Sequence, residues 1–354
     1  MRKYYIDNLR WMTVLLLFPY HTLMVYNSFG ENFYVKGPDL AFSTYILGAM
    51  WAWIMPLLFM VSGMGSFYSL QKRTVKEYLK ERVERLLLPL VSGILLLLPI
   101  QTFIAEKYHN SYTGGYLKQY VLFFTKPTDL TGYTGGFTPG HLWFILYLFV
   151  ISLVSSPLMR YYIKSEKKIP TKKMSLPIIM LLFIVPLLSQ PLLDIAGKSV
   201  GEYLAWFLIG FFVISDDEVQ EKLQKHRVLL TIVSVVLLLI YGFFGMQLVE
   251  KSVIVYEILY GLNAHVSILA IIGNGKQYLN FNNRASQYLT KSSFSIYLFH
   301  QQWVVIAAYF SLMYISNLGL QMVVILVSSI VFTFLSYFVL SKVPFIRYIF
   351  GLTK

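Results

Sequence analysis

Residues 323–339 read VVILVSSIVFTFLSYFV, and residues 229–241 read LLTIVSVVLLLIY. Both stretches are apolar on every side and do not alternate every second residue, so they favour helices over the strands of a membrane barrel. About 20 apolar residues span a bilayer as a helix, and in hydrocarbon only helices and closed barrels satisfy every backbone polar group. Similar stretches recur along the chain, which indicates an all-α integral membrane protein.

The composition agrees with a polytopic bundle. Of 354 residues, 56% are hydrophobic and only 13% are charged, whereas soluble domains carry about 25% charged residues. We expect one transmembrane domain over residues 1–354, with no appended soluble domain. About ten spans are predicted, near residues 8–27, 43–70, 86–104, 141–161, 175–194, 200–215, 228–247, 252–273, 292–313 and 319–341.

The basic residues predict the orientation. With the N-terminus inside, 23 of the 30 Lys and Arg residues fall in inner segments and six in outer loops, while Arg10 lies within the first span. This split predicts a multi-pass cell-membrane protein with both termini in the cytoplasm. It also explains the net charge of +13 without a nucleic-acid partner.

The chain has no cysteine, which excludes disulfides, thiolate metal sites and a cysteine nucleophile. No zinc motif occurs, so no metal is expected, and the sequence also contains no Gly-rich nucleotide fingerprint. The longest outer loop, about 105–140, is rich in glycine, tyrosine and threonine. It is either the lining of an external polar cavity or a flexible surface loop.

Ionisable residues inside a membrane are costly and therefore mark functional positions. Arg10 and His21 are eleven residues apart, about three helical turns plus 20°, so one continuous helix would place them on one face. Asp7 is spaced to pair with Arg10. His300 is expected about 13 Å deep, close to the depth of His21, so the two histidines could share a cavity. A snorkelling arginine and two separately packed histidines are the structural alternative.

A second group of basic residues suits a phosphate-bearing ligand. Arg82 and Arg85 stand three apart at the start of an apolar run, and Arg73 lies in the same inner loop. Arginine forks match phosphate geometry, although membrane orientation alone also explains them.

Four further residues are weaker candidates for lining a substrate cavity. They are Ser62 beside Gly63, His141, Trp143 and Glu257. Helix packing or anchoring at the membrane interface explains each of them equally well.

Five motifs in order resemble the acyltransferase 3 family of membrane proteins. Arg10 is followed by His21, and the others are FMVSG at 59–63, RVERLLLP at 82–89, HLWF at 141–144 and IYLFH at 296–300. Residues 59–89 look most like the glucan biosynthesis protein C branch, whose members are associated with succinylation of extracytoplasmic glucans. The resemblance covers most of the chain.

The resemblance implies a ten-helix bundle that moves an acyl group, acetyl or succinyl, from cytoplasmic acyl-CoA to a hydroxyl of an envelope carbohydrate. On that analogy Arg10 and His21 form the catalytic pair, and Arg82 and Arg85 face the donor phosphates. The resemblance is compatible with a protein that acts alone, as a homodimer or with a separate partner.

The chemistry is consistent with these residues. Acyl transfer from a thioester to an alcohol needs a base and stabilisation of an oxyanion, and an imidazole suits the base role near neutral pH. His21 is the predicted general base, Arg10 assists the donor and His300 orients; a transient acyl-histidine is the alternative. The competing functions are a transporter or flippase that uses the buried Arg and His, and a structural or sensor protein without turnover.

Overall fold

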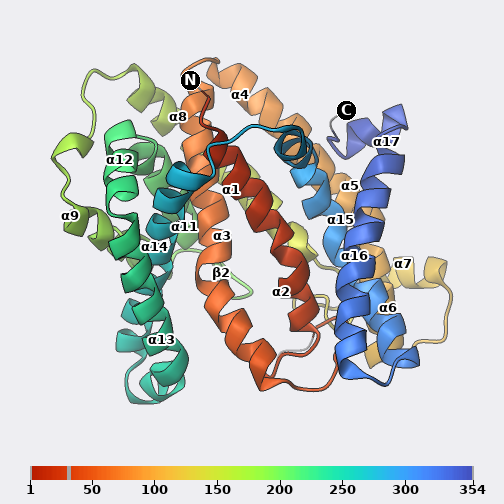
Figure 1. Ribbon diagram of the computed structural model, residues 1–354. Helices are drawn as coiled ribbons and strands as arrows, with labels where there is room; N and C mark the ends of the chain where they lie inside the picture. Colours follow the sequence, from red (N-terminus) through yellow and green to blue (C-terminus); the bar gives the residue numbers. More distant parts are fainter. Residues whose placement is uncertain (1, 30–32, 353–354) are drawn as a thin grey trace. The chain divides into compact units, whose positions relative to one another are not determined.

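The computed structural model describes residues 2–29 and 33–352, with the backbone alone at 243 and 245–248. The described chain is almost entirely helical (Figure 1). It divides into two compact units that are interleaved along the sequence. Unit 1 comprises the described residues of Met1–Trp11, Gly48–Glu81 and Tyr147–Gln287, and unit 2 those of Met12–Leu47, Arg82–Leu146 and Tyr288–Lys354.

The first half of the chain contains α1 (Tyr4–Leu15), α2 (Leu17–Met24), α3 (Ala41–Leu70), α4 (Val75–Arg82), η1 (Val83–Leu87), α5 (Leu88–Leu96), α6 (Leu98–His109), α7 (Tyr116–Thr125), η2 (Gly140–Leu142) and α8 (Trp143–Lys164). The second half contains η3 (Thr171–Lys173), α9 (Leu176–Leu181), α10 (Ile184–Ser189), the antiparallel strands β1 (Asp194–Ile195) and β2 (Lys198–Ser199), α11 (Val200–Ile209), η4 (Gly210–Ile214), α12 (Asp217–Lys225), α13 (Arg227–Lys251), α14 (Val253–Tyr278), α15 (Arg284–Tyr314), α16 (Leu318–Leu340) and α17 (Pro344–Ile349).

Six helical segments in the described chain are long and apolar enough to cross a membrane. They are Ala41–Leu70, Val75–His109, Gly140–Lys164, Val253–Tyr278, Arg284–Tyr314 and Leu318–Leu340. The pair Asp217–Lys225 and Arg227–Gly242, bent by 70°, would make a seventh, and shorter apolar helices occupy Leu176–Ser189 and Val200–Ile214. The all-helical class is confirmed, while the count of ten spans stays a prediction.

The predicted first span, 8–27, is divided in the structure. The α1 and α2 helices meet at Leu16, three residues before Pro19. Proline has no N–H to donate to the carbonyl of Leu15, and its ring crowds that carbonyl. Backbone bonds at Leu16, to Met12 and from Tyr20 (both 3.1 Å), carry the chain through the break. His21 therefore lies on a short helix of its own.

In unit 1, α3 and the α11–η4 segment approach each other backbone to backbone. A Cβ added to Gly63 would lie 2.0 Å from the carbonyl oxygen of Phe207, and one added to Gly210 would lie 2.1 Å from that of Met60. No side chain fits in either place. Helix packing therefore accounts for Gly63 of the FMVSG motif.

In unit 2, the last described residues pack onto η1 and the start of α5. A Cβ on Gly351, which has a φ of +58°, would lie 3.1 Å from Pro89 and 3.6 Å from the carbonyl of Glu84. The neighbouring Phe350 is 4% exposed and contacts the ring of Phe299 at 5.4 Å. The segment after α17 is thus part of the core of unit 2.

Candidate active site

Three histidines from separate elements of unit 2 lie together. His21 is in α2, His141 in η2 and His300 in α15. The ring centroid of His300 lies 5.1 Å from that of His21 and 5.2 Å from that of His141. His300 and His141 are buried and His21 is half-buried. We call these residues the histidine cluster; no group of described residues, this one included, has the geometry to hold a metal ion.

Two successive carbonyls of α15 fix which ring nitrogens carry hydrogen. Nδ1 of His300 lies 2.7 Å from the oxygen of Tyr297, and Nε2 of His141 lies 3.0 Å from that of Leu298. A carbonyl only accepts, so both nitrogens are donors, and the opposite nitrogen of each neutral ring keeps its lone pair.

These opposite nitrogens are buried. Nε2 of His300 and Nδ1 of His141 have no hydrogen-bond partner among the described residues, and the same holds for Nδ1 of His21. Buried polar atoms are normally paired, and exceptions often have a catalytic role. The cluster therefore holds basic nitrogens that are available to a substrate proton.

Aromatic rings surround the cluster. The ring of Phe18 meets that of His300 edge-on at 5.8 Å, and Phe33 stacks on His21 at 5.9 Å with 14° between the planes. Both phenylalanines are 1% exposed. An apolar wall of this kind limits water near the imidazoles and strengthens electrostatic interactions between them and a bound group.

The turn before α8 places His141 in the cluster. Gly140 has a φ of +49°, and a Cβ there would lie 2.7 Å from the side chain of Leu98. The N–H of Gly140 donates to Oγ1 of Thr138 at 2.7 Å, and the hydroxyl of Tyr297 donates to the carbonyl of His141. His141 is thus held from both sides, by its own turn and by α15.

The long loop that precedes this turn is built around a buried carboxylate. Glu106, whose side chain is 5% exposed, pairs with Lys126 at 2.6 Å and accepts a hydrogen bond from Asn110 at 2.7 Å. Lys126 also donates to the carbonyl of Thr134 at 2.9 Å. A Cβ on Gly135, where φ is +95°, would lie 2.0 Å from Glu106. These contacts indicate an ordered loop, while its role as the lining of an external cavity stays a prediction.

Arg10 belongs to unit 1. It forms the expected i,i+3 pair with Asp7, at 3.6 Å, and its side chain is 37% exposed. Its guanidinium lies 3.3 Å from the position of a Cβ on Gly65, so α1 and α3 are close at this point. His21 belongs to unit 2 and follows the break at Leu16, so the shared helix face with Arg10 stays a prediction.

Arg82 directly precedes a widened turn, and Arg85 lies within it. η1 is a π-helix in which the N–H of Leu88 bonds the carbonyl of Val83. Because Pro89 lacks an N–H, the carbonyl of Arg85 has no ordinary i+4 donor, and a local π-turn accommodates this loss. Arg82 is half-buried and Arg85 exposed. The widened turn changes the angle between their side chains from that of the regular helix that the sequence predicted.

Arg73, the third residue predicted to bind the phosphate-bearing ligand, forms an ion pair with Glu81 in unit 1. Trp143 begins α8 in unit 2, two residues after His141. Trp143 is therefore close in sequence to one member of the histidine cluster, as the HLWF motif requires.

Two predicted cavity residues lie in unit 1. The hydroxyl of Ser62 donates to the carbonyl of Leu58 at 2.7 Å, within its own helix. Glu257 accepts a hydrogen bond from Gln190 at 3.3 Å. Their assignment to the cavity of the histidines stays a prediction.

Sequence reasoning missed a buried amide network in unit 2. Nε2 of Gln301 donates to Oε1 of Gln101 at 3.2 Å, and Gln119 donates to Oγ1 of Thr102 at 2.9 Å. All four residues are buried. The signal was present in the sequence, because two glutamines directly follow His300 within a span.

Comparisons with known proteins identify the family of the chain. A family model described as an acyltransferase domain, that of the acyltransferase 3 family, matches residues 3–341. The chain is 24% identical to the glucans biosynthesis protein C of Salmonella schwarzengrund and of Salmonella typhi, and 22% identical to that of Salmonella paratyphi B. Each match runs over 330 residues and covers 84% of this chain and 81% of the relative. No solved structure matches it. The chain belongs to the acyltransferase 3 family of membrane proteins.

Proposed function

We propose that this membrane acyltransferase moves an acetyl or succinyl group from acyl-CoA to a hydroxyl of an envelope carbohydrate, with His21 as the general base. The observation that carries the proposal is the histidine cluster, with its buried and unpartnered ring nitrogens. The names of the similar proteins refer to glucans, which makes a glucan hydroxyl our first choice of acceptor.

The reaction balances with His21 as a proton carrier. The imidazole takes the proton of the acceptor hydroxyl while its oxygen bonds to the thioester carbonyl carbon. The resulting tetrahedral oxyanion collapses, the C–S bond breaks, and the CoA thiolate receives the proton from His21. General-base catalysis of this kind contributes about 10²–10⁴-fold.

His300 and His141 act as positioning residues in this scheme. Their donor nitrogens are bonded to carbonyls of α15, so both rings have a fixed orientation beside His21. The lone pair of His300 Nε2 is available to the proton that His21 receives, which would spread the positive charge over two rings. We propose that Arg10 assists the donor thioester on the cytoplasmic side.

The donor's phosphates are assigned to Arg82 and Arg85, with Arg73 in the same inner loop. The observation behind this assignment is the exposed position of Arg85 beside the half-buried Arg82 at η1, together with the ability of guanidinium groups to bind phosphate bidentately. This assignment requires that the arginines face the cytoplasm. They do so in the proposed topology, with ten spans in the cell membrane and both termini in the cytoplasm, which the basic inner segments support.

The test is acyl transfer by purified full-length protein in lipid nanodiscs. Acetyl-CoA or succinyl-CoA, labelled in the acyl group, is supplied with a glucan acceptor, and the glucan is analysed by mass spectrometry while CoA release is followed in parallel. We expect labelled ester on the glucan together with CoA release. CoA release without any labelled acceptor would reject the carbohydrate, and neither product with either donor would reject the proposal.

A further inference from the structure

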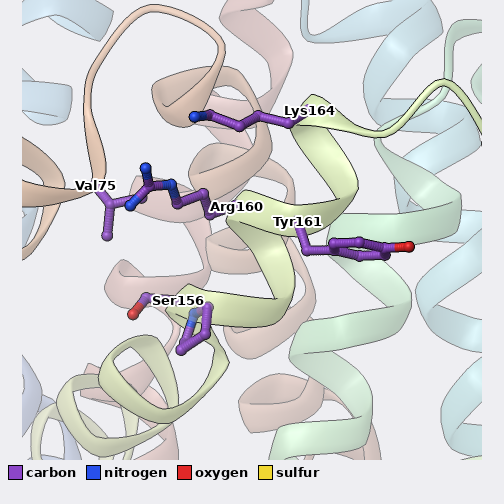
Figure 2. Close-up of a pocket in the computed structure, with 6 residues that line it drawn as sticks. Val75, Ser156, Arg160, Tyr161 and Lys164 are labelled. Atoms are coloured by element: carbon purple, nitrogen blue, oxygen red, sulfur yellow. The ribbon is translucent and has the colours of Figure 1, made fainter.

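A pocket of about 500 Å³ lies in unit 1 at the C-terminal end of α8 and is separate from the residues assigned to acyl transfer. It is lined by Val75, Ser156, Pro157, Arg160, Tyr161 and Lys164. In Figure 2 the side chains of Arg160 and Lys164 extend to the same side of α8, toward Val75 at the start of α4, while Tyr161 extends the other way. No acidic side chain lines this pocket.

The pocket includes the hydroxyl of Ser156, whose hydrogen bond follows from the proline in α8. Pro157 has no N–H to donate to the carbonyl of Leu153, and the hydroxyl of Ser156 takes that place with a 2.9 Å bond. The ring of Pro157 and the satisfied carbonyl leave the oxygen of Ser156 able to accept a further hydrogen bond. The pocket thus combines one hydroxyl with two cations.

Both cations are unpaired among the described residues. Neither Arg160 nor Lys164 makes a side-chain hydrogen bond or ion pair there, and both are exposed. Other basic residues of unit 1 do have acidic partners, as Lys172 has Glu218 at 2.7 Å. Arg160 and Lys164 are spaced i,i+4 on one helix face, so they can reach one anion together.

The face of α8 that carries the two cations continues as an apolar, exposed stripe. Leu153 stands seven residues before Arg160, Val150 stands three before Leu153, and they are 47% and 38% exposed. This stripe leads away from the two cations toward the middle of a membrane-spanning segment, Gly140–Lys164. A ligand that covers both features has an anionic head and an acyl chain.

We infer that this pocket binds an anionic phospholipid, with its headgroup phosphate between Arg160 and Lys164 and an acyl chain along the apolar stripe. The basic segment 160–174 is expected on the cytoplasmic side, where anionic lipids attract basic residues. Free CoA carries the same phosphate chemistry but no long acyl chain to cover Val150 and Leu153. The inference stands apart from acyl transfer, because it uses none of the residues placed in that reaction.

The test compares lipid binding by the variant R160Q/K164Q with that of the wild type. The control K167Q/K173Q removes the same two charges from the segment that follows α8, where neither lysine side chain has a partner among the described residues. Native mass spectrometry of full-length protein in detergent measures bound phosphatidylglycerol, with phosphatidylcholine as the zwitterionic probe. Thermal unfolding verifies that all variants are folded. If the double variant does not fold, the single variants R160Q and K164Q replace it in the binding measurement.

We expect R160Q/K164Q to bind phosphatidylglycerol about 30-fold more weakly, as the loss of two basic contacts to one lipid implies. Binding by the control and all binding of phosphatidylcholine should stay unchanged. An equal loss in the control would show a general charge effect and overturn the inference. A separate titration with CoA distinguishes the source of the phosphate. Weakened CoA binding with unchanged phosphatidylglycerol binding would assign the pocket to the soluble donor. If the binding of neither probe changes, the pocket binds no anion and the inference is wrong.

Discussion

The exchange of His21 for alanine tests the catalytic assignment directly. The variant loses an imidazole whose centroid lies 5.1 Å from that of His300 and 5.9 Å from that of Phe33. Each aromatic contact of this type contributes about 0.5–1.5 kcal/mol to stability, and the side chain is only half-buried. We therefore expect a folded variant with a modest loss of stability.

The expected loss of activity is much larger. A general base contributes about 10²–10⁴-fold, which corresponds to about 3–5 kcal/mol in the barrier. The measurement is turnover per folded molecule, with labelled acyl-CoA and acceptor in nanodiscs, alongside the affinity for the donor. We expect donor affinity to stay close to wild type, and His300→Ala to have a milder effect on turnover.

His265 offers a matched control. It is a fully buried histidine of unit 1 that lies outside the histidine cluster. Its Nε2 bonds the carbonyl of Ile179 at 2.8 Å, its Nδ1 likewise has no partner among the described residues, and its ring stacks on Trp206 at 5.4 Å. His265→Ala should lower the thermal midpoint more than His21→Ala and leave turnover per folded molecule unchanged. The reasoning fails if His21→Ala keeps more than about a tenth of wild-type turnover, a smaller loss than a general base gives.

Four more predictions follow from the described contacts and the charge pattern. Gly63→Ala should lower stability by about 1–3 kcal/mol or more, because the added Cβ meets the carbonyl of Phe207, which is backbone and cannot rotate away; thermal unfolding in detergent measures it. Burial would raise the pKa of the Asp129 carboxyl, but hydrogen bonds from the following residues outweigh it and hold that pKa below its ordinary value. The carboxylate therefore stabilises the loop at neutral pH, and amide exchange over 126–139, corrected for intrinsic rate, should accelerate as pH falls through the range where it protonates. Replacing Arg82 and Arg85 by lysine should raise the KM for acyl-CoA about tenfold, since lysine keeps the charge and loses the bidentate fork. Reporter fusions after residues 165 and 220 should report cytoplasm, and fusions near 120 the outside.

Each of these has a discriminating control. Gly48→Ala in the same helix adds a Cβ with nothing within 4 Å and should be neutral or slightly stabilising; an equal loss at both glycines would refute the close-approach argument. Asp129→Asn should abolish the pH dependence of loop exchange. Unchanged KM in both lysine variants would leave Arg82 and Arg85 as orientation signals only. A cytoplasmic signal near 120 would reverse the topology.

Sequence alone led to His21 and His300 because histidine is conspicuous within an apolar span. Sequence reasoning gave less weight to His141. Its place beside His300 depends on a turn with a positive φ at Gly140 and on the hydrogen bond that its Nε2 donates to the carbonyl of Leu298 in α15. Neither feature leaves a periodic signal. The amides Gln101 and Gln301 were visible as polar residues in spans, but their pairing is a tertiary contact between distant segments.

The sequence predicted that the apolar stretches are helices, but it did not predict where a helix is interrupted or widened. Hydropathy detects apolar length, and it does not register a break at Leu16 or a π-turn at 83–87, because both depend on one missing N–H at a proline. The prolines were in the sequence, so the positions of the irregularities could have been anticipated. Their form, a break in one place and a widened turn in another, is decided by what packs around them, such as Gly351 against Pro89.

The close approach of α3 to the α11–η4 segment, at Gly63 and Gly210, has a mechanical consequence. Most helix crossings are cushioned by side chains, which can change rotamer and let one helix slide past another. Here backbone meets backbone, so the crossing has no such compliance and behaves as a fixed pivot for α3 and η4. Any rearrangement within unit 1 during a catalytic cycle must turn about this point or occur away from it. Because the chain contains no cysteine, a pair of probes placed on either side of the pivot would report that rotation without background labelling.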